Sequence, residues 1–295
     1  MNKKYSMITD IAFLNSLGKE KEIFTRMFND DFFSNESKWN DPVLSTEIPG
    51  LLDNIKARMK YFMSKMSLGV YNVLDIGPGQ NIRENDEIYL ISGFTEIGTI
   101  SKIGDLIMDN DYSINPSLFP NSVHHISLCY YTILKKISNY CAAITDGLYT
   151  NFSFINFIKN RSRINGDFII VSGEEDASFF VYEKDNPLEI IPSFTAYKVV
   201  TDSPSGFLYG GFTENIDELK ELEIYKKADY IFADKNTFMM LKKQKDNIYT
   251  EFPLIKDNPC GIAFRLAFPF YFNCRGDSIV IEKIENKFYY FEVKL

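Results

Sequence analysis

Hydrophobic and polar residues alternate along the first part of the chain in blocks that predict strands and helices in turn. Short apolar runs predict strands over 6–13, 87–92, 140–145 and 167–172. Apolar positions at helical spacing predict helices over 19–29, 51–68, 98–108, 122–136 and 149–159. The polar and Gly/Pro-rich segments 32–49, 75–86 and 109–120 are expected to be loops. Such alternation is typical of an α/β layer fold.

The second part of the chain has shorter and weaker patterns. Strands are predicted over 179–182, 197–200 and 230–233, and helices over 217–226 and 236–243. The apolar segment 260–272 predicts a buried helix that Pro269 should end. Ser205-Gly206 is interpreted as part of a Pro/Gly turn. Alternating residues over 278–284 and 287–293, joined by Glu285-Asn286, predict a closing hairpin.

Composition narrows the class of protein. The 295 residues include 45% hydrophobic and 24% charged residues, which is typical of a globular chain of one large domain or two small ones. A net charge of -8 disfavours a protein that mainly binds nucleic acid, because phosphate contacts need a basic face. No apolar run approaches the roughly 20 residues of a membrane span. The first residues do not form a signal peptide, because Thr9 and Asp10 interrupt the apolar stretch. We therefore expect a cytoplasmic protein without membrane contact.

Few residues could support chemistry of their own. The 4 cysteines form no CxxC pair and are expected to be buried free thiols, and the 2 histidines, His124 and His125, are adjacent. A buried, hydrogen-bonded histidine is the expectation there. Gly77-Pro-Gly79 is a poor phosphate loop, because proline lacks an amide donor. The run Glu174-Glu175-Asp176 could hold a metal, but consecutive acids seldom converge on one point, so a solvated loop is expected. We expect no metal and no cofactor.

Five segments resemble, in the right order, segments of β-ketoacyl synthases. The stretch 115–133, in which Phe119-Pro-Asn-Ser122 leads into Val123-His124, resembles the Phe-Pro-x-Ser motif and the helix that follows it. The stretch 7–18 resembles the opening strand and Ser-x-Leu-Gly turn, and 56–60 resembles the Arg-Met helix. The stretch 89–98 resembles the strand and Gly-rich segment before Phe-Pro, and 167–173 the Asp-x-x-x-x-Gly-Gly strand. Together these segments lie within residues 5–180.

The departures from that family concern catalysis. A condensing ketosynthase attacks its acyl thioester with a cysteine at the start of a helix, and two later histidines assist. Counting from Phe119-Pro120, the place of the cysteine falls at Gly147 or Leu148. Cys141 lies too early, inside the predicted strand, and no histidine follows residue 125. We therefore expect no catalytic residues and no condensation by this chain alone.

The resemblance together with these losses points to the chain length factor of type II polyketide synthases, a subunit that has lost the nucleophile. It implies an α/β chain with a thiolase-like αβαβα sandwich of two half-units. Residues 1–180 would form the N-terminal half-unit and 181–295 a shortened C-terminal one, within one domain. It also implies a heterodimer with an active ketosynthase subunit. The C-terminal half matches the family only faintly, at Cys260-Gly-Ile-Ala and the closing hairpin.

The resemblance also assigns site residues. The partner interface would include the strand 140–145 and the start of the preceding helix: Ser122, His124, Tyr140, Cys141, Ala142, Ala143, Ile144 and Thr145. The pocket that limits product length by steric exclusion would be lined by Phe94, Ile97, Thr99 and Ile100.

The net charge bears on how an acyl carrier protein would bind, and the missing histidines bear on functions other than that of a chain length factor. Acyl carrier proteins are acidic, so an acidic chain should leave their docking mainly to the ketosynthase partner. One alternative is an independent acyltransferase or hydrolase that reuses the fold with Thr145, Thr150 or Ser153, although no downstream histidine is present to activate a hydroxyl. Another is a standalone structural or acyl-binding protein.

Overall fold

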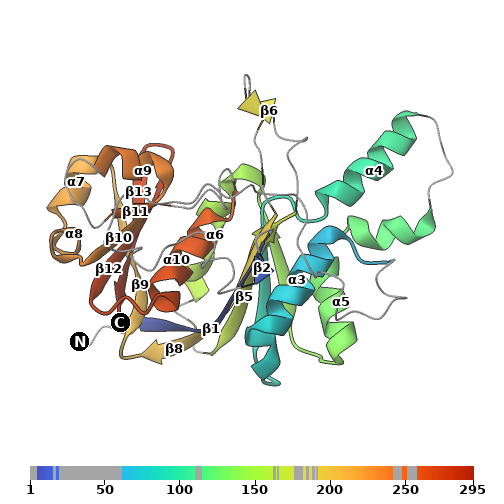
Figure 1. The fold of residues 1–295 in the computed structure, drawn as a ribbon, viewed down its shortest axis with the longest axis horizontal. Helices are drawn as coiled ribbons and strands as arrows, with labels where there is room; N and C mark the ends of the chain where they lie inside the picture. Colours follow the sequence, from blue (N-terminus) through green and yellow to red (C-terminus); the bar gives the residue numbers. More distant parts are fainter. Residues whose placement is uncertain are drawn as a thin grey trace.

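The structure is a computed structural model. It describes residues 5–15, 18–19, 62–109, 115–161, 164, 166–175, 182–183, 186–187, 190, 192–241, 248–250 and 258–295. Within this part of the chain one large sheet carries helices on both sides (Figure 1).

Five strands form the first half of the large sheet, in the order β4-β3-β5-β8-β1. Strand β3 pairs in parallel with β4 and β5, whereas β8 is antiparallel to both β5 and β1. The strands are β1 (Tyr5–Asn15), β3 (Glu87–Ser92), β4 (Cys141–Thr145), β5 (Phe168–Glu174) and β8 (Ser193–Ser203).

The second half repeats this arrangement, in the order β11-β10-β12-β13-β9. Strand β10 pairs in parallel with β11 and β12, and β13 is antiparallel to both β12 and β9. Numbered within each set, both halves have the strand order 3-2-4-5-1 with the fifth strand reversed. The strands are β9 (Gly206–Thr213), β10 (Tyr230–Ala233), β11 (Ile248–Thr250), β12 (Asp277–Ile284) and β13 (Lys287–Lys294).

The two sets meet where β1 pairs with β9 at Ser6 and Phe207. The first set extends from Tyr5 to Ser203, and the second is completed between Gly206 and Lys294. The chain thus contains two half-units of one topology, and the C-terminal one is shorter, as predicted. The strand β8 lies after residue 180 and belongs by pairing to the first set. A short two-stranded sheet, β6 (Tyr182–Glu183) and β7 (Asn186–Pro187), precedes it.

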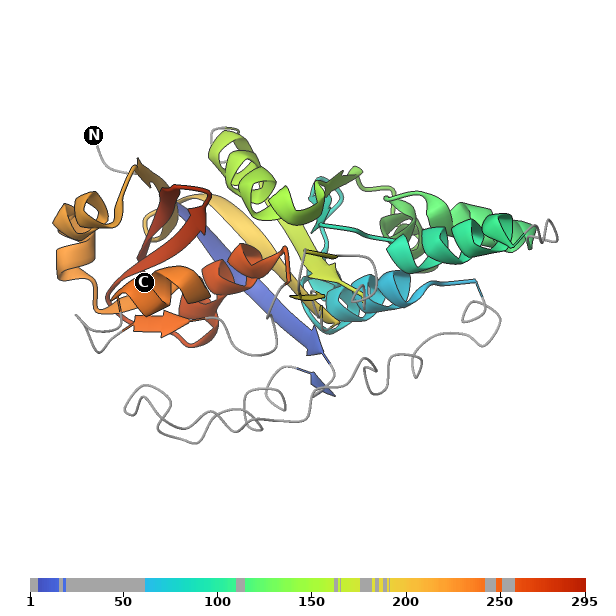
Figure 2. The ribbon, with the colours of Figure 1, turned by 90° about the horizontal axis from the view of Figure 1, so that it is seen from above.

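Helices cover the strands in layers (Figures 1 and 2). The outer helices of the first half-unit are α3 (Lys65–Ile76) and α5 (Ile126–Lys135). The outer helices of the second are α7 (Ile216–Glu221), α8 (Glu223–Lys227) and α9 (Lys235–Leu241). Between the half-units lie α6 (Thr150–Arg161) and α10 (Gly261–Tyr271), each of which connects the third and fourth strands of its own set. The helix α4 (Ile97–Met108) projects away from the sheets.

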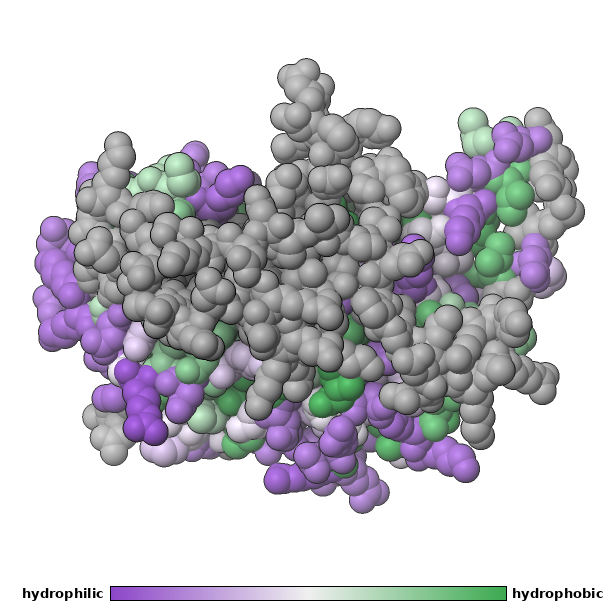
Figure 3. Space-filling view, viewed as in Figure 1, coloured by the Kyte–Doolittle hydropathy of each residue, from purple (hydrophilic) through white to green (hydrophobic). Residues whose placement is uncertain are grey.

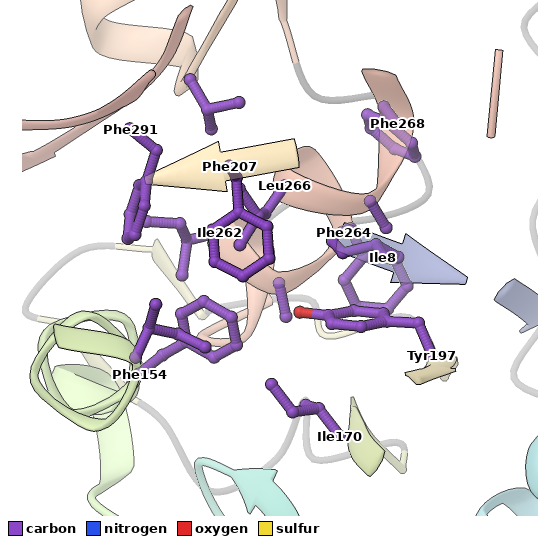
Figure 4. Close-up of a cluster of buried hydrophobic side chains, with 14 of the residues drawn as sticks. Ile8, Phe154, Ile170, Tyr197, Phe207, Ile262, Phe264, Leu266, Phe268 and Phe291 are labelled. Atoms are coloured by element: carbon purple, nitrogen blue, oxygen red, sulfur yellow. The ribbon is translucent and has the colours of Figure 1, made fainter. Parts of the chain in front are cut away.

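Three hydrophobic cores match these layers. On β5, Ile169 and Val171 pack toward α3 and α5, whereas Phe168 and Ile170 pack toward α6 and α10. This alternation follows from the period of two in a strand. The central core is lined by aromatic rings such as Phe154 and contains most of α10, whose residues from Gly261 to Pro269 are all buried (Figure 4). The third core lies under α7, α8 and α9.

Most predicted elements in the described part are present, including strands at 87–92 and 230–233 with the expected ends. Most of the helix predicted over 51–68 lies outside the described residues. A helix begins at Lys65, where the Ser64 side chain accepts from the Ser67 N–H, and continues to Ile76. The helix predicted from 122 begins at Ile126, after a 3₁₀ segment (η2, Pro116–Ser122) that contains two prolines. Of the helix predicted over 19–29 only Lys19 is described, and it lies in the two-residue strand β2 (Gly18–Lys19). Most of the strand predicted over 179–182 also lies outside the described residues.

In the second half, the sequence pattern does not predict the strand β9, and the interpretation of Ser205-Gly206 as a turn covers its first residue. Its three glycines hide the hydrophobic alternation, and Gly206 itself has φ 137°. The helix predicted over 217–226 is divided in two at Leu222, which has an extended backbone. Pro269 does not end α10, which continues to Tyr271.

Candidate functional site

The strand β4 lies at the end of the sheet and pairs only with β3 among the described strands. The Ile88 N–H donates to the Tyr140 carbonyl at 2.9 Å. In a parallel sheet, the backbone N–H and C=O groups of successive residues point alternately to the two sides of a strand. Since the Tyr140 carbonyl points to β3, the backbone groups of Cys141, Ala143 and Thr145 face away from β3. An open edge of this kind is a template for pairing with another chain.

The residues predicted to form the partner interface are accessible. The five residues of β4 are half-buried, and Tyr140, which precedes them, is 62% exposed. Ser122 is half-buried and His124 is exposed. His124 Nδ1 lies 2.6 Å from the Thr95 hydroxyl. The expectation of a buried histidine is wrong, because both histidines precede the first turn of α5 and are exposed.

After β4 the chain turns at Gly147 into the central helix α6. Gly147 has φ 54°, a left-handed conformation that glycine adopts at little cost. Its N–H donates to the Gly93 carbonyl at 2.9 Å, and its carbonyl accepts from the Thr150 hydroxyl at 2.7 Å. Position 147 therefore lies at the N-terminal end of α6, where a helix dipole would stabilise a thiolate. Leu148 is 45% exposed and lies in the 3₁₀ turn that leads into the helix.

The turn after β3 borders position 147. Among the described residues, the only atom within 4 Å of a Cβ built at Gly147 is the ring carbon Cε1 of Phe94, at 3.9 Å. Of the predicted pocket residues, Phe94 is thus the one that the structure brings next to position 147. Ile97, Thr99 and Ile100 lie on the first turn of α4, where Thr99 is buried and the two isoleucines are half-buried.

Gly93 is a residue that sequence reasoning missed. A Cβ there would lie 2.5 Å from Pro259 Cγ, 2.8 Å from the Gly147 carbonyl oxygen and 3.0 Å from Glu174 Oε1. Only glycine fits at this crossing of segments from both half-units. The feature of the sequence that could have indicated this role is the position of Gly93 directly after a buried strand.

Glu174 ends β5 and is fully buried, so the prediction of a solvated acidic loop is wrong. Its carboxyl group accepts from the Ser92 hydroxyl at 2.8 Å and from the N–H groups of Gly93 and Phe94. It holds the turn that borders position 147. Burial raises the pKa of Glu174 to about 7, although these donors lower it in part.

Two more carboxyl groups lie at the starts of the outer helices. Glu175 accepts from the Met66 N–H in α3 at 3.1 Å and from the Gly98 N–H in α4 at 2.8 Å. Glu96 accepts from the hydroxyls of Ser67 at 3.0 Å and Ser127 at 2.5 Å, in the first turns of α3 and α5. Burial raises the pKa of Glu175 to about 7, with a further contribution from the charge of Glu96, and burial also raises the pKa of Glu96.

Cys260 lies at the start of α10, with Sγ 3.4 Å from Glu174 Oε1. Burial raises the pKa of this thiol well above its ordinary value, so it is a poor source of thiolate. Cys274 is also buried, as expected, whereas Cys129 and Cys141 are half-buried. Among the residues that the structure describes, no group of His, Cys, Asp and Glu could hold a metal ion.

A buried polar network joins α6 to the second half-unit. The Asn151 side chain accepts from the Ile262 N–H at 3.1 Å and donates to Glu282 at 2.9 Å, and Glu282 forms an ion pair with Arg265. This network fixes α6 against α10 and β12, and thereby the two half-units on either side of position 147.

The hydroxyl groups of Thr145, Thr150 and Ser153, which are the alternative nucleophiles, have different hydrogen-bond partners. The Thr150 hydroxyl donates to the Gly147 carbonyl, and the Ser153 hydroxyl donates to Asp146 at 2.5 Å. The Thr145 hydroxyl is buried and has no hydrogen-bond partner among the residues that the structure describes. Both histidines of the chain lie outside these contacts. None of the described helices is both long and apolar enough to cross a membrane.

Comparison with known proteins finds solved structures with a similar fold but no relative that matches by sequence. No protein-family model and no curated protein matches the chain. The chain is similar to a ketosynthase in complex with its chain length factor (ApeO with ApeC) from Xenorhabdus doucetiae, at 12% identity and a TM-score of 0.59, covering 98% of this chain and 99% of that chain. It is similar to the ishigamide ketosynthase/chain length factor at 10% identity and a TM-score of 0.66, covering 99% of both chains.

A third match is a type II polyketide synthase acyl carrier protein in complex with its ketosynthase (AntDE:AntF), at 10% identity and a TM-score of 0.63, over all of both chains. The repeated 3-2-4-5-1 topology and these likenesses define the class: the chain has a thiolase-like α/β sandwich fold. Within that class, its fold is that of the ketosynthase and chain length factor proteins, and the resemblance found in the sequence is confirmed for the fold.

Proposed function

We propose that this chain is a non-catalytic chain length factor, which pairs with an active ketosynthase and shapes the tunnel that limits polyketide length. One observation carries the proposal. The position predicted for the nucleophile, at the start of α6, holds Gly147, which has a left-handed backbone and no side chain to react. The only thiol near this turn among the described residues is buried and has a raised pKa.

The surroundings of the turn support a role in shaping a tunnel. Phe94 is the side chain nearest to the open side of Gly147, and Glu174 holds its backbone through the Phe94 N–H. A bulky ring on a fixed backbone limits the length of an apolar chain by steric exclusion, because packed interiors yield little. We propose that Ile97, Thr99 and Ile100 extend this wall, since α4 begins directly after the turn.

The open edge of β4 supports the pairing. Its outward backbone groups would bond to the matching strand of a ketosynthase, which would complete the sheet across the two chains. We propose that the complex works in the cytoplasm, and that an acyl carrier protein docks mainly on the ketosynthase.

The test is co-expression with a ketosynthase of the type II polyketide class from the same genome, followed by analysis of the product. We expect a heterodimer whose product lengthens in the Phe94→Ala variant, because removal of the ring deepens the tunnel. Phe212→Ala is the matched control, since Phe212 is an exposed phenylalanine on β9 in the other half-unit. A chain that never binds the ketosynthase, or that condenses acyl groups alone, would refute the proposal.

A further inference from the structure

The turn between β3 and α4 is held in place by both half-units. From the first, the Gly147 N–H donates to the Gly93 carbonyl at 2.9 Å. From the second, Pro259 lies so close to Gly93 that a Cβ there would come within 2.5 Å of the proline Cγ. The turn carries Phe94, whose ring borders the open side of Gly147. The place of this ring therefore depends on what fixes the turn.

One carboxyl group binds three consecutive residues of the turn. Glu174 Oε1 accepts from the Ser92 hydroxyl at 2.8 Å and from the Gly93 N–H, and Oε2 accepts from the Phe94 N–H at 3.1 Å. The Ser92 hydroxyl itself accepts from the Thr95 N–H at 3.0 Å. A carboxylate accepts such bonds more strongly than a neutral group does. Glu174 thus fixes Phe94 together with the residues on either side of it.

The carboxyl group of Glu174 is enclosed by the protein. Glu174 is fully buried at the end of β5, where it pairs with Ser193 on β8. The Cys260 thiol of the second half-unit lies 3.4 Å from its Oε1. A group enclosed in this way can influence a bound acyl chain only through the residues that it holds. Glu174 is therefore a positioning residue, and the side chain that it positions is Phe94.

The turn requires an acceptor at both carboxyl oxygens. If glutamine replaced Glu174, its NH₂ group would face the N–H of Gly93 or the N–H of Phe94 in either orientation, because an amide NH₂ only donates. A buried donor without an acceptor is costly, so the turn would move to find another partner. A packed wall excludes a longer chain only while its backbone does not yield. A displaced turn would let the Phe94 ring move aside.

We infer that Glu174 determines product length together with Phe94, by fixing the turn that carries the ring. This role rests on the proposed function, which supplies the tunnel and its product. It places one determinant of length at the end of β5, and it lets Pro259 and Cys260 of the second half-unit contribute to a wall in the first. Product length then depends on a buried hydrogen-bond network as well as on the bulk of one side chain.

The test is the Glu174→Gln variant in complex with the ketosynthase, with product lengths measured by mass spectrometry. We expect the products to shift toward longer chains than those of the wild-type complex, because the Phe94 ring is no longer held. Affinity for the ketosynthase should be unchanged, since Glu174 is fully buried within this chain. Glutamine has nearly the same shape and no charge, so the variant is expected to fold.

Asp234→Asn is the matched control. The Asp234 carboxyl group is also buried and accepts from the N–H groups of Thr237 at 3.0 Å and Lys283 at 2.8 Å, and from the Thr237 hydroxyl at 2.5 Å. It lies between β10 and α9 in the second half-unit, where Figure 3 shows mostly hydrophilic side chains over α7 and α8. The same chemical change there should leave product lengths and binding as in the wild type.

A double substitution tests whether Glu174 acts through Phe94. In the Phe94→Ala background the ring is absent, so Glu174→Gln should cause no further change in product length. Two independent determinants would instead add their effects. A merely structural role of Glu174 would lower the yield in both backgrounds and leave the lengths unchanged.

Hydrogen exchange of the isolated chain gives a second measurement that needs no product. The amides of Gly93 and Phe94 should exchange at least about tenfold faster in Glu174→Gln, because their acceptor is lost. If this variant does not fold, Ser92→Ala removes one of the same hydrogen bonds. It should shift product length in the same direction by a smaller amount.

The outcomes separate this inference from the proposed function. If Phe94→Ala lengthens the product but Glu174→Gln and Ser92→Ala leave it unchanged, the inference is wrong and the proposed function stands. An equal effect of Glu174→Gln with and without the Phe94 ring would also overturn the inference. If Phe94→Ala leaves product length unchanged, or the chain binds no ketosynthase, the proposed function fails and the inference with it.

Discussion

Glu174 and Glu175 illustrate how single residues near the turn acquire their roles from distant parts of the chain. Their side chains bond to different segments: Glu174 to the turn at 92–94, and Glu175 to the starts of α3 and α4. From the sequence we expected a solvated loop, because adjacent acids seldom share one site. The two carboxyl groups indeed do not share a site. Each accepts hydrogen bonds from its own set of buried donors, which belong to residues up to 109 positions away.

The raised pKa values of Glu174 and Glu175 lead to a prediction that stability depends on pH. Their folded pKa of about 7 lies above the ordinary value of 4.5, so the folded state retains protons that the unfolded state has lost. Their contribution to the unfolding free energy should therefore decrease as pH rises from 4.5 to 7, by up to about 1.4 kcal/mol per pH unit and group. Urea denaturation across this window should give a flatter profile for Glu174→Gln and Glu175→Gln. Glu221→Gln, at an exposed carboxylate, is the control, and identical profiles for all variants would contradict the assignment.

At the level of elements, the edge strand β4 and the central helix α6 were predicted from the sequence at nearly their observed limits. The apolar run before Asp146 and the Phe-rich periodicity after it are strong local signals. The strand β9 was missed, because Gly206, Gly210 and Gly211 interrupt the alternation. At Gly210 a Cβ would collide with the ring of Tyr290 in the neighbouring strand β13. The requirement for glycine there arises from the neighbour, so local pattern could not reveal it.

The two sides of β4 should respond differently to proline. Ala143→Pro removes an N–H that faces away from β3, so the chain should fold normally yet bind the ketosynthase at least about tenfold more weakly. Ala142→Pro removes an N–H on the β3 side and should lower the unfolding free energy of the isolated chain by roughly 3 kcal/mol. Paired measurements of melting temperature and affinity distinguish the two. Equal effects of both substitutions on folding would contradict the hydrogen-bonding pattern described for this strand.

For the whole molecule, the two half-units place their third connections, α6 and α10, side by side in the central layer. The network of Asn151, Glu282 and Arg265 joins them across the middle of the protein. This arrangement brings Gly147 of the first half-unit close to Pro259 and Cys260 of the second, around Gly93. The site therefore exists only in the assembled molecule.

The net charge of -8 leads to a prediction at this scale. An acidic acyl carrier protein should bind the complex of this chain with its ketosynthase, but not this chain alone, because like charges repel at the encounter. Surface plasmon resonance at low and physiological salt would measure both. Removal of arginines from the ketosynthase should abolish binding, whereas substitutions of exposed acids in this chain should change it little. Tight binding of the carrier protein to the isolated chain would contradict this division.

The sequence by itself determined the alternation of strands and helices, the absence of a nucleophile at positions 147 and 148 and of any later histidine, and a resemblance that gave the right fold. These features are local: they depend on periodicity, on residue identity and on the order of short motifs. The tertiary structure alone decided that Glu96, Glu174 and Glu175 are buried, that Gly93 must be glycine, that His124 is exposed, and that α4 projects from the sheet with only Thr99 buried. Each of these depends on which distant segments supply donors, contacts or solvent, and a linear pattern carries no record of such neighbours.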